Sequence, residues 1–325
     1  MLSILAGSSG LGRMNLELGT MRGIVYFSAA VLALNAAISS ASAQERLRDR
    51  LRERLGAVRQ GREAPPILGC EKVQIGGLKL AVWRPKNQEG QAPLVIFSHG
   101  FKGVNTQTVF LMKALAAAGY LVMAPNHKDA TTGGNMSDKP DEDFKKAGTW
   151  SAATYKDRGD DIKHLLAALH KDHEWNAKID WSKVALAGHS LGGYTALACA
   201  GAWPSWKLPE VKAVLALSPY AQPFVLHGSL DKLGVPVMYQ GGTMDVGITP
   251  FVKRPGGAFS KTSSPAYFVE FSKAGHFFWT GFNRDVSKQE LIDRYCLAFL
   301  NKYLRGESTE TLDQRLDGVS ELQKK

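Results

Sequence analysis

The sequence predicts a three-layer α/β fold, with a mostly parallel sheet, helices on both faces and no large cap domain. Short apolar runs alternate with helical segments from about residue 67 to residue 305. Apolar runs without polar alternation are typical of parallel strands that are buried on both faces. The 325 residues are 44% hydrophobic and 22% charged, which excludes a disordered chain, and 3 cysteines are too few for a disulfide scaffold.

The first half of this domain begins with a hairpin. Strands are expected at residues 72–75 and 78–83, because Gly76 and Gly77 between them favour a tight turn. The next elements are a strand at residues 93–98, a helix near residues 106–118 and a strand at residues 120–124. A polar segment at residues 126–149 follows, and it is too short for a cap domain.

The second half continues the alternation of helix and strand. A helix near residues 157–170 places Ile162, Leu165, Leu166 and Leu169 on one face. The later elements are a strand at residues 184–187, a helix at 191–200, strands at 211–217, 235–240 and 266–271, a helix at 286–304 and a polar C-terminal tail at 306–325.

The first 43 residues have the pattern of a secretory signal peptide. A basic stretch begins at Met21 and Arg22, an apolar run covers residues 24–38, and Ala43 ends a small-residue cleavage motif before Gln44. The run is shorter than the roughly 20 residues of a spanning helix, so we favour cleavage over an uncleaved membrane anchor. We therefore expect a secreted or periplasmic protein. Met1, Met14 and Met21 are all open as the true start.

An Arg-rich linker is expected at residues 44–66, between the signal and the domain. Residues 44–63 hold seven Arg against four acids, with leucines at helical spacing, and a Pro-Pro pair ends the segment. We interpret it as a solvated amphipathic helix, with a weak contact to an anionic surface as the alternative. No nucleic-acid-binding motif accompanies the net charge of +10, so no nucleic acid partner is expected.

The chemistry centres on Ser190, in the motif Gly-His-Ser-Leu-Gly at residues 188–192. The motif lies between a predicted strand and a predicted helix, where a nucleophile sits on a sharp, strained turn. Such a turn needs positions without side chains two residues before and two after the serine, as Gly188 and Gly192 provide. The alternative is a glycine-rich turn with a serine cap, but the strand-turn-helix setting favours a nucleophile.

A serine nucleophile needs a base, and the base needs an orienting carboxylate. For this architecture the chain order is serine, acid, histidine. Asp245 and His276 each follow a predicted strand, and the carboxyl ends of strands are where open α/β sheets gather their ligands. We therefore expect a triad of Ser190, Asp245 and His276. His227 stays open as a base and Asp231 as an acid, although Asp231 precedes its strand.

A Ser-His-Gly-Phe sequence at residues 98–101 follows the strand at 93–98 and suits an oxyanion hole. In such folds one donor is a backbone N–H of this loop, and the other is the N–H of the residue after the nucleophile. These would be Phe101 and Leu191. The other histidines and acids lack metal-ligand spacing, so we expect no metal and no cofactor.

With these parts in place, the chain resembles a serine α/β-hydrolase. Within that superfamily it is similar to the branch of platelet-activating-factor acetylhydrolases, chlorophyllases, dienelactone-hydrolase-like proteins and bacterial cutinase-type polyester hydrolases. The motifs that carry the resemblance are residues 97–101, 119–125, 157–161, 179–184, 188–193, Asp245 and 274–276, within about residues 68–304. The resemblance implies Ser190 as nucleophile, Asp245 as acid, His276 as base, and Phe101 and Leu191 as oxyanion donors.

At two positions the sequence differs from particular families of this branch. True dienelactone hydrolases use a cysteine where this chain has Ser190, and the polyester hydrolases usually carry Trp where this chain has His189. The expected activity is that of a secreted, esterase- or lipase-like serine hydrolase that cleaves carboxylic esters through an acyl-enzyme. An amidase, peptidase or thioesterase on the same triad is the nearest alternative, and a non-catalytic binding protein is a further one.

Aromatic residues flank the motifs and predict an apolar site for a small-molecule or lipid-like ester. The residues expected to contact substrate are His189, Phe101, Trp150 and Trp279. In an oxidising compartment Cys70 and Cys296 could pair, and the sequence leaves this open. It gives no indication of the oligomeric state.

Overall fold

The computed structural model describes residues 69–86, 88–131 and 141–325. The expected signal peptide at residues 1–43 and the Arg-rich linker at residues 44–66 lie outside the described residues. Pro66–Lys325 form one compact unit. Within the described ranges, no helix is long and apolar enough to cross a membrane.

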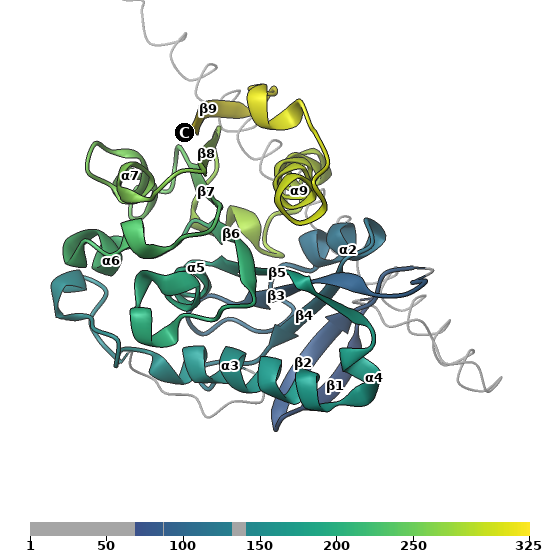
Figure 1. Ribbon diagram of the computed structural model, residues 1–325. Coiled ribbons are helices and arrows are strands. Elements are labelled where there is room, and N and C mark those ends of the chain that lie inside the picture. Colours follow the sequence, from purple (N-terminus) through teal and green to yellow (C-terminus); the bar gives the residue numbers. More distant parts are fainter. Residues whose placement is uncertain (1–68, 87, 132–140) are drawn as a thin grey trace, which may run out of the picture. The chain divides into compact units, whose positions relative to one another are not determined.

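A mixed sheet forms the centre of this unit, and in the described residues it has nine strands in the order β1-β2-β4-β3-β5-β6-β7-β8-β9 (Figure 1). The strands are β1 Glu71–Ile75, β2 Leu78–Trp83, β3 Ala92–Ser98, β4 Leu121–Pro125, β5 Ile179–His189, β6 Val211–Leu217, β7 Val237–Gly242, β8 Ala266–Phe271 and β9 Val319–Lys324. The six strands from β4 to β8 in this order run parallel, while β1, β2 and β9 pair antiparallel. The predicted fold class is therefore confirmed.

Helices cover both faces of the sheet (Figure 1). On one face α2 (Val109–Ala117) and α9 (Val286–Leu300) pack against the strands and contribute to one apolar core. On the other face α3 (Lys156–Lys171), α5 (Leu191–Leu197) and α6 (Gln222–His227) contribute to a second core. The apolar stripe predicted for α3 is buried in this second core, as expected from its 3.6-residue spacing. The shorter helices are α4 His173–Asn176, α7 Thr249–Lys253 and α8 Ala258–Lys261.

Strands β3, β6, β7 and β8 match the predicted positions within two residues, whereas β5 extends the strand predicted at residues 184–187 to Ile179–His189. Every residue of β3, β7 and β8 is buried, which explains their uninterrupted apolar sequences. β7 begins two residues later than predicted because Pro236 has no N–H to donate to the ladder. Between β4 and α3 the described residues contain a single short turn of helix, Ala147–Thr149, and no cap domain.

The polar tail predicted for residues 306–325 is wrong in its second half. Residues Val319–Lys324 form the edge strand β9, which pairs antiparallel with β8. Only Val319 and Leu322 are apolar in this strand, so the sequence carries little periodic signal there. Backbone hydrogen bonds to β8 supply the pairing instead.

The three cysteines are buried and free, so the open pairing of Cys70 with Cys296 is not formed. Cys70 precedes β1, at the opposite sheet edge from β8 and β9. Cys296 lies on α9, where its sulfur accepts a hydrogen bond from Gln240 at 3.2 Å.

Candidate active site

Ser190 occupies a strained turn between β5 and α5. Its backbone has φ 56° and ψ −117°, a conformation that a residue with a side chain rarely adopts. The neighbouring backbones are too close for side chains on either side. A Cβ on Gly188 would lie 2.2 Å from the Gly192 oxygen, and a Cβ on Gly192 would lie 1.9 Å from the Ser98 oxygen. The two glycines are therefore required by the turn that presents the Ser190 hydroxyl.

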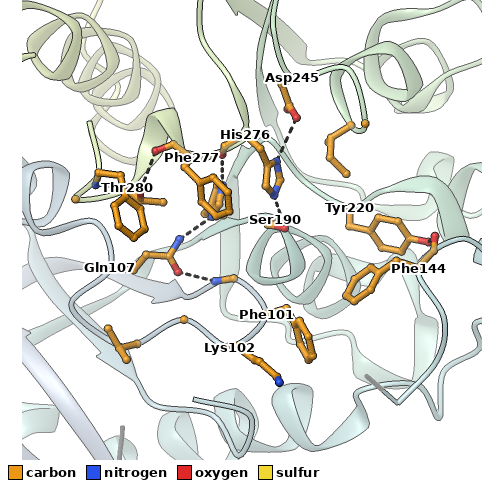
Figure 2. A pocket seen from close by; sticks show the side chains of 18 of the residues that line it. Phe101, Lys102, Gln107, Phe144, Ser190, Tyr220, Asp245, His276, Phe277 and Thr280 are labelled. Carbon is orange, nitrogen blue, oxygen red and sulfur yellow. Dashed lines mark hydrogen bonds and ion pairs between the residues drawn. The ribbon is translucent and has the colours of Figure 1, made fainter. Parts of the chain in front are cut away.

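The structure brings Ser190, His276 and Asp245 into one line of contacts (Figure 2). The Ser190 Oγ lies 2.9 Å from His276 Nε2, and His276 Nδ1 lies 3.2 Å from Asp245 Oδ1. The three residues follow β5, β8 and β7, whose carboxyl ends meet at one edge of the sheet. This arrangement can pass a proton from the serine hydroxyl to the imidazole while the carboxylate holds the ring in place.

Two hydroxyl groups complete the surroundings of Asp245. Ser218 Oγ donates to Asp245 Oδ2 at 2.6 Å and lies 2.9 Å from His276 Nδ1, and Thr249 Oγ1 donates to Asp245 Oδ2 at 3.1 Å. Burial alone would raise the pKa of Asp245, but the hydrogen bonds from His276 and Ser218 outweigh it and hold the pKa below its ordinary value. The carboxylate therefore stays ionised beside His276.

Ser218 was not predicted from the sequence, although its position directly after a predicted strand could have indicated it. Ser218 directly follows the strand β6, at the same edge of the sheet as the triad residues. The two open alternatives are placed elsewhere. The His227 ring contacts the Trp150 carbonyl oxygen at 2.8 Å, and Asp231 lies in the short helix Leu230–Lys232 before β7.

Hydrogen bonds to the carbonyl oxygen of Gly100 fix the loop that is expected to supply an oxyanion donor. The carbonyl oxygen of Gly100 accepts hydrogen bonds from Gly103 N at 2.9 Å and from Arg158 Nη2 at 3.2 Å. In a trans peptide the N–H points opposite to the C=O, so the N–H of Phe101 is directed away from these donors. Among the described residues, none accepts a hydrogen bond from the N–H of Phe101 or of Leu191. Both groups are available to a bound oxygen atom.

Arg158 is the buried centre behind this loop, with 0% of its surface exposed. It donates to the His99 carbonyl oxygen at 2.7 Å and pairs with both carboxylate oxygens of Asp129, at 3.0 and 2.8 Å. Burial would raise the pKa of Asp129, but the charge of Arg158, its hydrogen bonds and the neighbouring His99 and His127 together outweigh burial and lower the pKa. The buried pair fixes the strand-to-loop transition that ends at Phe101.

A cavity of about 930 Å³ opens beside Ser190 and His276. The apolar side chains that line it are Phe101, Val104, Phe144, Tyr220, Met244, Val246, Ile248, Phe277 and Phe282. Met244, Val246, Phe277 and Phe282 are also strongly exposed, between 61% and 79%. The mouth of the cavity is therefore an apolar rim, contributed by the loops that carry Asp245 and His276.

Of the four residues expected to contact substrate, two line the cavity and two do not. Phe101 and His189 line the cavity. Trp150 and Trp279 do not, and both are fully buried, which corrects the prediction. Trp150 packs behind Tyr220, with ring centres 4.7 Å apart, and the Trp279 indole donates to Gln240 at 2.8 Å in the core beneath α9. Their place next to a motif in the sequence did not reveal which way the side chains point.

Within residues 69–86, 88–131 and 141–325, no group of three or more His, Cys, Asp or Glu side chains could hold a metal ion.

Comparisons with known proteins agree with this architecture. Residues 70–225, which include Ser190, match the chlorophyllase family. The platelet-activating factor acetylhydrolase of Cavia porcellus is 26% identical over 159 residues, which cover 39% of this chain and 36% of that protein. The chain thus spans little more than a third of that relative's length.

A solved structure extends the match over most of the unit. The ferulic acid esterase from Streptomyces cinnamoneus superposes with a TM-score of 0.55 and 17% identity, covering 76% of this chain and 88% of that one. At this identity the match shows the fold, and the fold is that of the α/β-hydrolases. The chain therefore has the α/β-hydrolase fold, and it is similar to the branch that contains the chlorophyllases and the platelet-activating-factor acetylhydrolases.

Proposed function

We propose that this protein is a serine carboxylic-ester hydrolase that acts through Ser190, His276 and Asp245. The observation that carries the proposal is the contact of 2.9 Å between Ser190 Oγ and His276 Nε2 at a strained strand-to-helix turn. The chlorophyllase family, the acetylhydrolase and the ferulic acid esterase support an ester rather than another acyl substrate.

The reaction follows from the positions of these groups. Ser190 Oγ attacks the ester carbonyl carbon while His276 Nε2 takes its proton, and Asp245 stabilises the imidazolium. The carbonyl oxygen becomes an oxyanion, which the N–H groups of Phe101 and Leu191 bind. His276 then gives the proton to the departing alkoxide, which leaves as the alcohol. Water then attacks the acyl-enzyme while His276 takes its proton, and His276 returns that proton to Ser190 Oγ as the acid leaves, which restores the free hydroxyl.

The substrate class follows from the cavity. Its volume of about 930 Å³ and its aromatic and aliphatic lining suit an ester with a sizeable apolar group. Phe101 and His189 belong to this lining and would contact the bound ester. The exposed rim of Met244, Val246 and Phe282 would extend that contact to a lipid-like chain.

A substrate panel tests the proposal against the other acyl chemistries. Matched p-nitrophenyl ester, thioester and p-nitroanilide substrates with the same acyl group are compared on the wild type and on Ser190→Ala. We expect ester hydrolysis to exceed amide hydrolysis, and to fall at least about 1,000-fold in Ser190→Ala. Faster anilide or thioester cleavage would move the assignment to an amidase or a thioesterase.

We also propose that the protein is exported. The support is the sequence pattern of residues 1–43, with its apolar run and small-residue cleavage motif. The test is N-terminal sequencing of the protein recovered from a bacterial host. Export predicts a mature chain that begins at Gln44, in the periplasm or the medium. An intact N-terminus in the cytoplasmic fraction would contradict it.

A further inference from the structure

We propose that Gln107 is a positioning residue that ties the oxyanion loop to the loop of the base, through His189. The inference rests on the proposed function, because it assigns Gln107 a part in the same reaction. Gln107 belongs to none of the motifs, although it follows the motif at residues 97–101 closely in the sequence, and it lies just outside the triad in space (Figure 2).

The side-chain amide of Gln107 bridges two elements of the site. Its Oε1 accepts a hydrogen bond from the N–H of Gly100 at 2.9 Å, and its Nε2 donates to His189 Nδ1 at 2.6 Å. A backbone N–H can only donate, so the contact with Gly100 fixes the amide orientation and places the NH₂ group against His189. Gly100 immediately precedes Phe101, the proposed oxyanion donor.

His189 connects Gln107 to the backbone of the base, His276. With Nδ1 accepting from Gln107, the proton of the neutral ring sits on Nε2, which donates to the carbonyl oxygen of His276 at 2.7 Å. His189 is 2% exposed, and burial, with the neighbouring His276 next in importance, lowers its pKa to about 3. The ring is therefore neutral at ordinary pH and works as a fixed spacer between two loops.

The backbone beside Gln107 reinforces the same connection. The Gln107 carbonyl oxygen accepts from Gly281 N at 2.8 Å, and the next residue, Thr108, donates its hydroxyl to the Trp279 carbonyl oxygen at 2.8 Å. Two direct hydrogen bonds, and a third connection through His189, thus hold the segment that begins with His276 to Gln107 and Thr108. A Cβ on Gly103 would lie 2.3 Å from Gln107 Oε1, so this glycine leaves the space that the amide occupies.

The function of this bridge is to keep the oxyanion donor and the base in fixed positions relative to each other during the reaction. The oxyanion donor and the base must both meet the same tetrahedral carbon, and a displacement of about 1 Å can cost about 100-fold in rate. Gln107 contacts neither the proposed nucleophile nor the acid directly. Gln107 also lines the cavity, but the apolar surface that would bind the ester comes from other residues. Loss of Gln107 should therefore lower kcat far more than it changes KM.

The first test replaces the amide by an apolar group of similar size. In Gln107→Leu we expect kcat for a p-nitrophenyl ester to fall about 10- to 100-fold, with KM within about threefold of the wild type. Gln74→Leu, an exposed glutamine on β1 away from the site, is the control and should keep wild-type kcat. Wild-type kcat in Gln107→Leu, or a loss confined to KM, would overturn the proposal.

The second test keeps the shape and changes the hydrogen-bonding role. A carboxylate in Gln107→Glu still accepts from Gly100 but cannot donate to His189 Nδ1, so His189 must bind a proton to keep both contacts. We expect the His189 resonances, followed by NMR, to titrate at a higher pH than in the wild type. A charge beside His276 disfavours the imidazolium, so kcat should be depressed most where His189 is protonated. An unchanged His189 titration would overturn the bridge even if Gln107→Leu fails to fold.

These outcomes are separable from a failure of the proposed function. If the wild type neither hydrolyses esters nor reacts at Ser190 with a fluorophosphonate, the proposed function fails. The His189 titration still reports the contact with Gln107 in that case. If the wild type is active and both Gln107 variants match it, only the positioning role is lost.

Discussion

The hydroxyl of Ser218 donates a hydrogen bond of 2.6 Å to the carboxylate of Asp245. The same oxygen lies 2.9 Å from His276 Nδ1, so it contacts both partners of the proposed acid–base pair. Ser218 adopts the left-handed backbone region, with φ 44°, directly after β6. This strained position gives the hydroxyl a place between the loops after β7 and β8.

Loss of the Ser218 hydroxyl should weaken the support that Asp245 gives to His276. In Ser218→Ala one of the hydrogen bonds that lower the pKa of Asp245 is missing, so that pKa rises. The Asp245 carboxylate is then held less firmly against the imidazolium that forms during the reaction. We expect a fall in kcat of about tenfold, for a loss of about 1.4 kcal/mol. The kcat for a p-nitrophenyl ester checks this, with Ser263→Ala as the control. Wild-type kcat in Ser218→Ala would contradict the prediction.

Arg158 should dominate the stability of the loop beneath Phe101. Arg158→Met leaves Asp129 buried without its cation, which is expected to cost about 3–5 kcal/mol in the free energy of unfolding. Chemical denaturation measures the loss. The double variant Arg158→Met with Asp129→Asn should recover part of it, because the unpaired charge is gone. If the double variant is as unstable as the sum of the two single variants, the two residues are not coupled.

The apolar rim should set the preference for acyl length. Val246→Ser and Phe282→Ser each remove an exposed apolar contact at the mouth of the cavity. We expect KM for an octanoate ester to rise about fivefold, for about 1 kcal/mol of lost apolar contact, and KM for an acetate ester to stay unchanged. Leu226→Ser is the matched control, since Leu226 is 62% exposed but lies outside this cavity. Equal effects on both esters would rule out the rim as a binding surface.

Asp293 on α9 should make the stability depend on pH. Burial raises its pKa to about 7, and within the described part of the chain its Oδ1 has no hydrogen-bond partner. The folded state then holds a proton that the unfolded chain has released, so wild-type stability falls as the pH rises through this range. Asp293→Asn should therefore be more stable than the wild type at pH 8, by about 1–3 kcal/mol, and not at pH 4. Thermal melts at the two pH values measure this difference in stability, and they need no assay of enzyme activity.

The parallel strands and the turn at Ser190 were predictable because their signals are local. A buried parallel strand needs an unbroken apolar run, and the turn at Ser190 needs glycine at both flanking positions, whatever the rest of the chain does. The same reasoning placed Asp245 and His276, since each follows a strand of that kind. These parts of the fold and site follow from rules that act within a few residues.

The remaining parts depend on contacts between distant segments. Gln107 has no motif, because its role comes from meeting His189, 82 residues later. Trp150 and Trp279 turn into the two cores although each lies close to the site in the sequence. Strand β9 forms through backbone pairing with β8, which leaves little trace in the side chains. Such features are decided by tertiary packing, which one sequence does not reveal.

Reaction with a fluorophosphonate probe tests whether Ser190 is a nucleophile that His276 activates. The wild type is incubated with the probe, and the modified residue is identified by peptide mass spectrometry. We expect one adduct, on Ser190, that forms far more slowly in His276→Ala, because the base can no longer take the proton of the hydroxyl. No adduct on Ser190, or labelling that is equally fast in His276→Ala, would contradict the proposed mechanism.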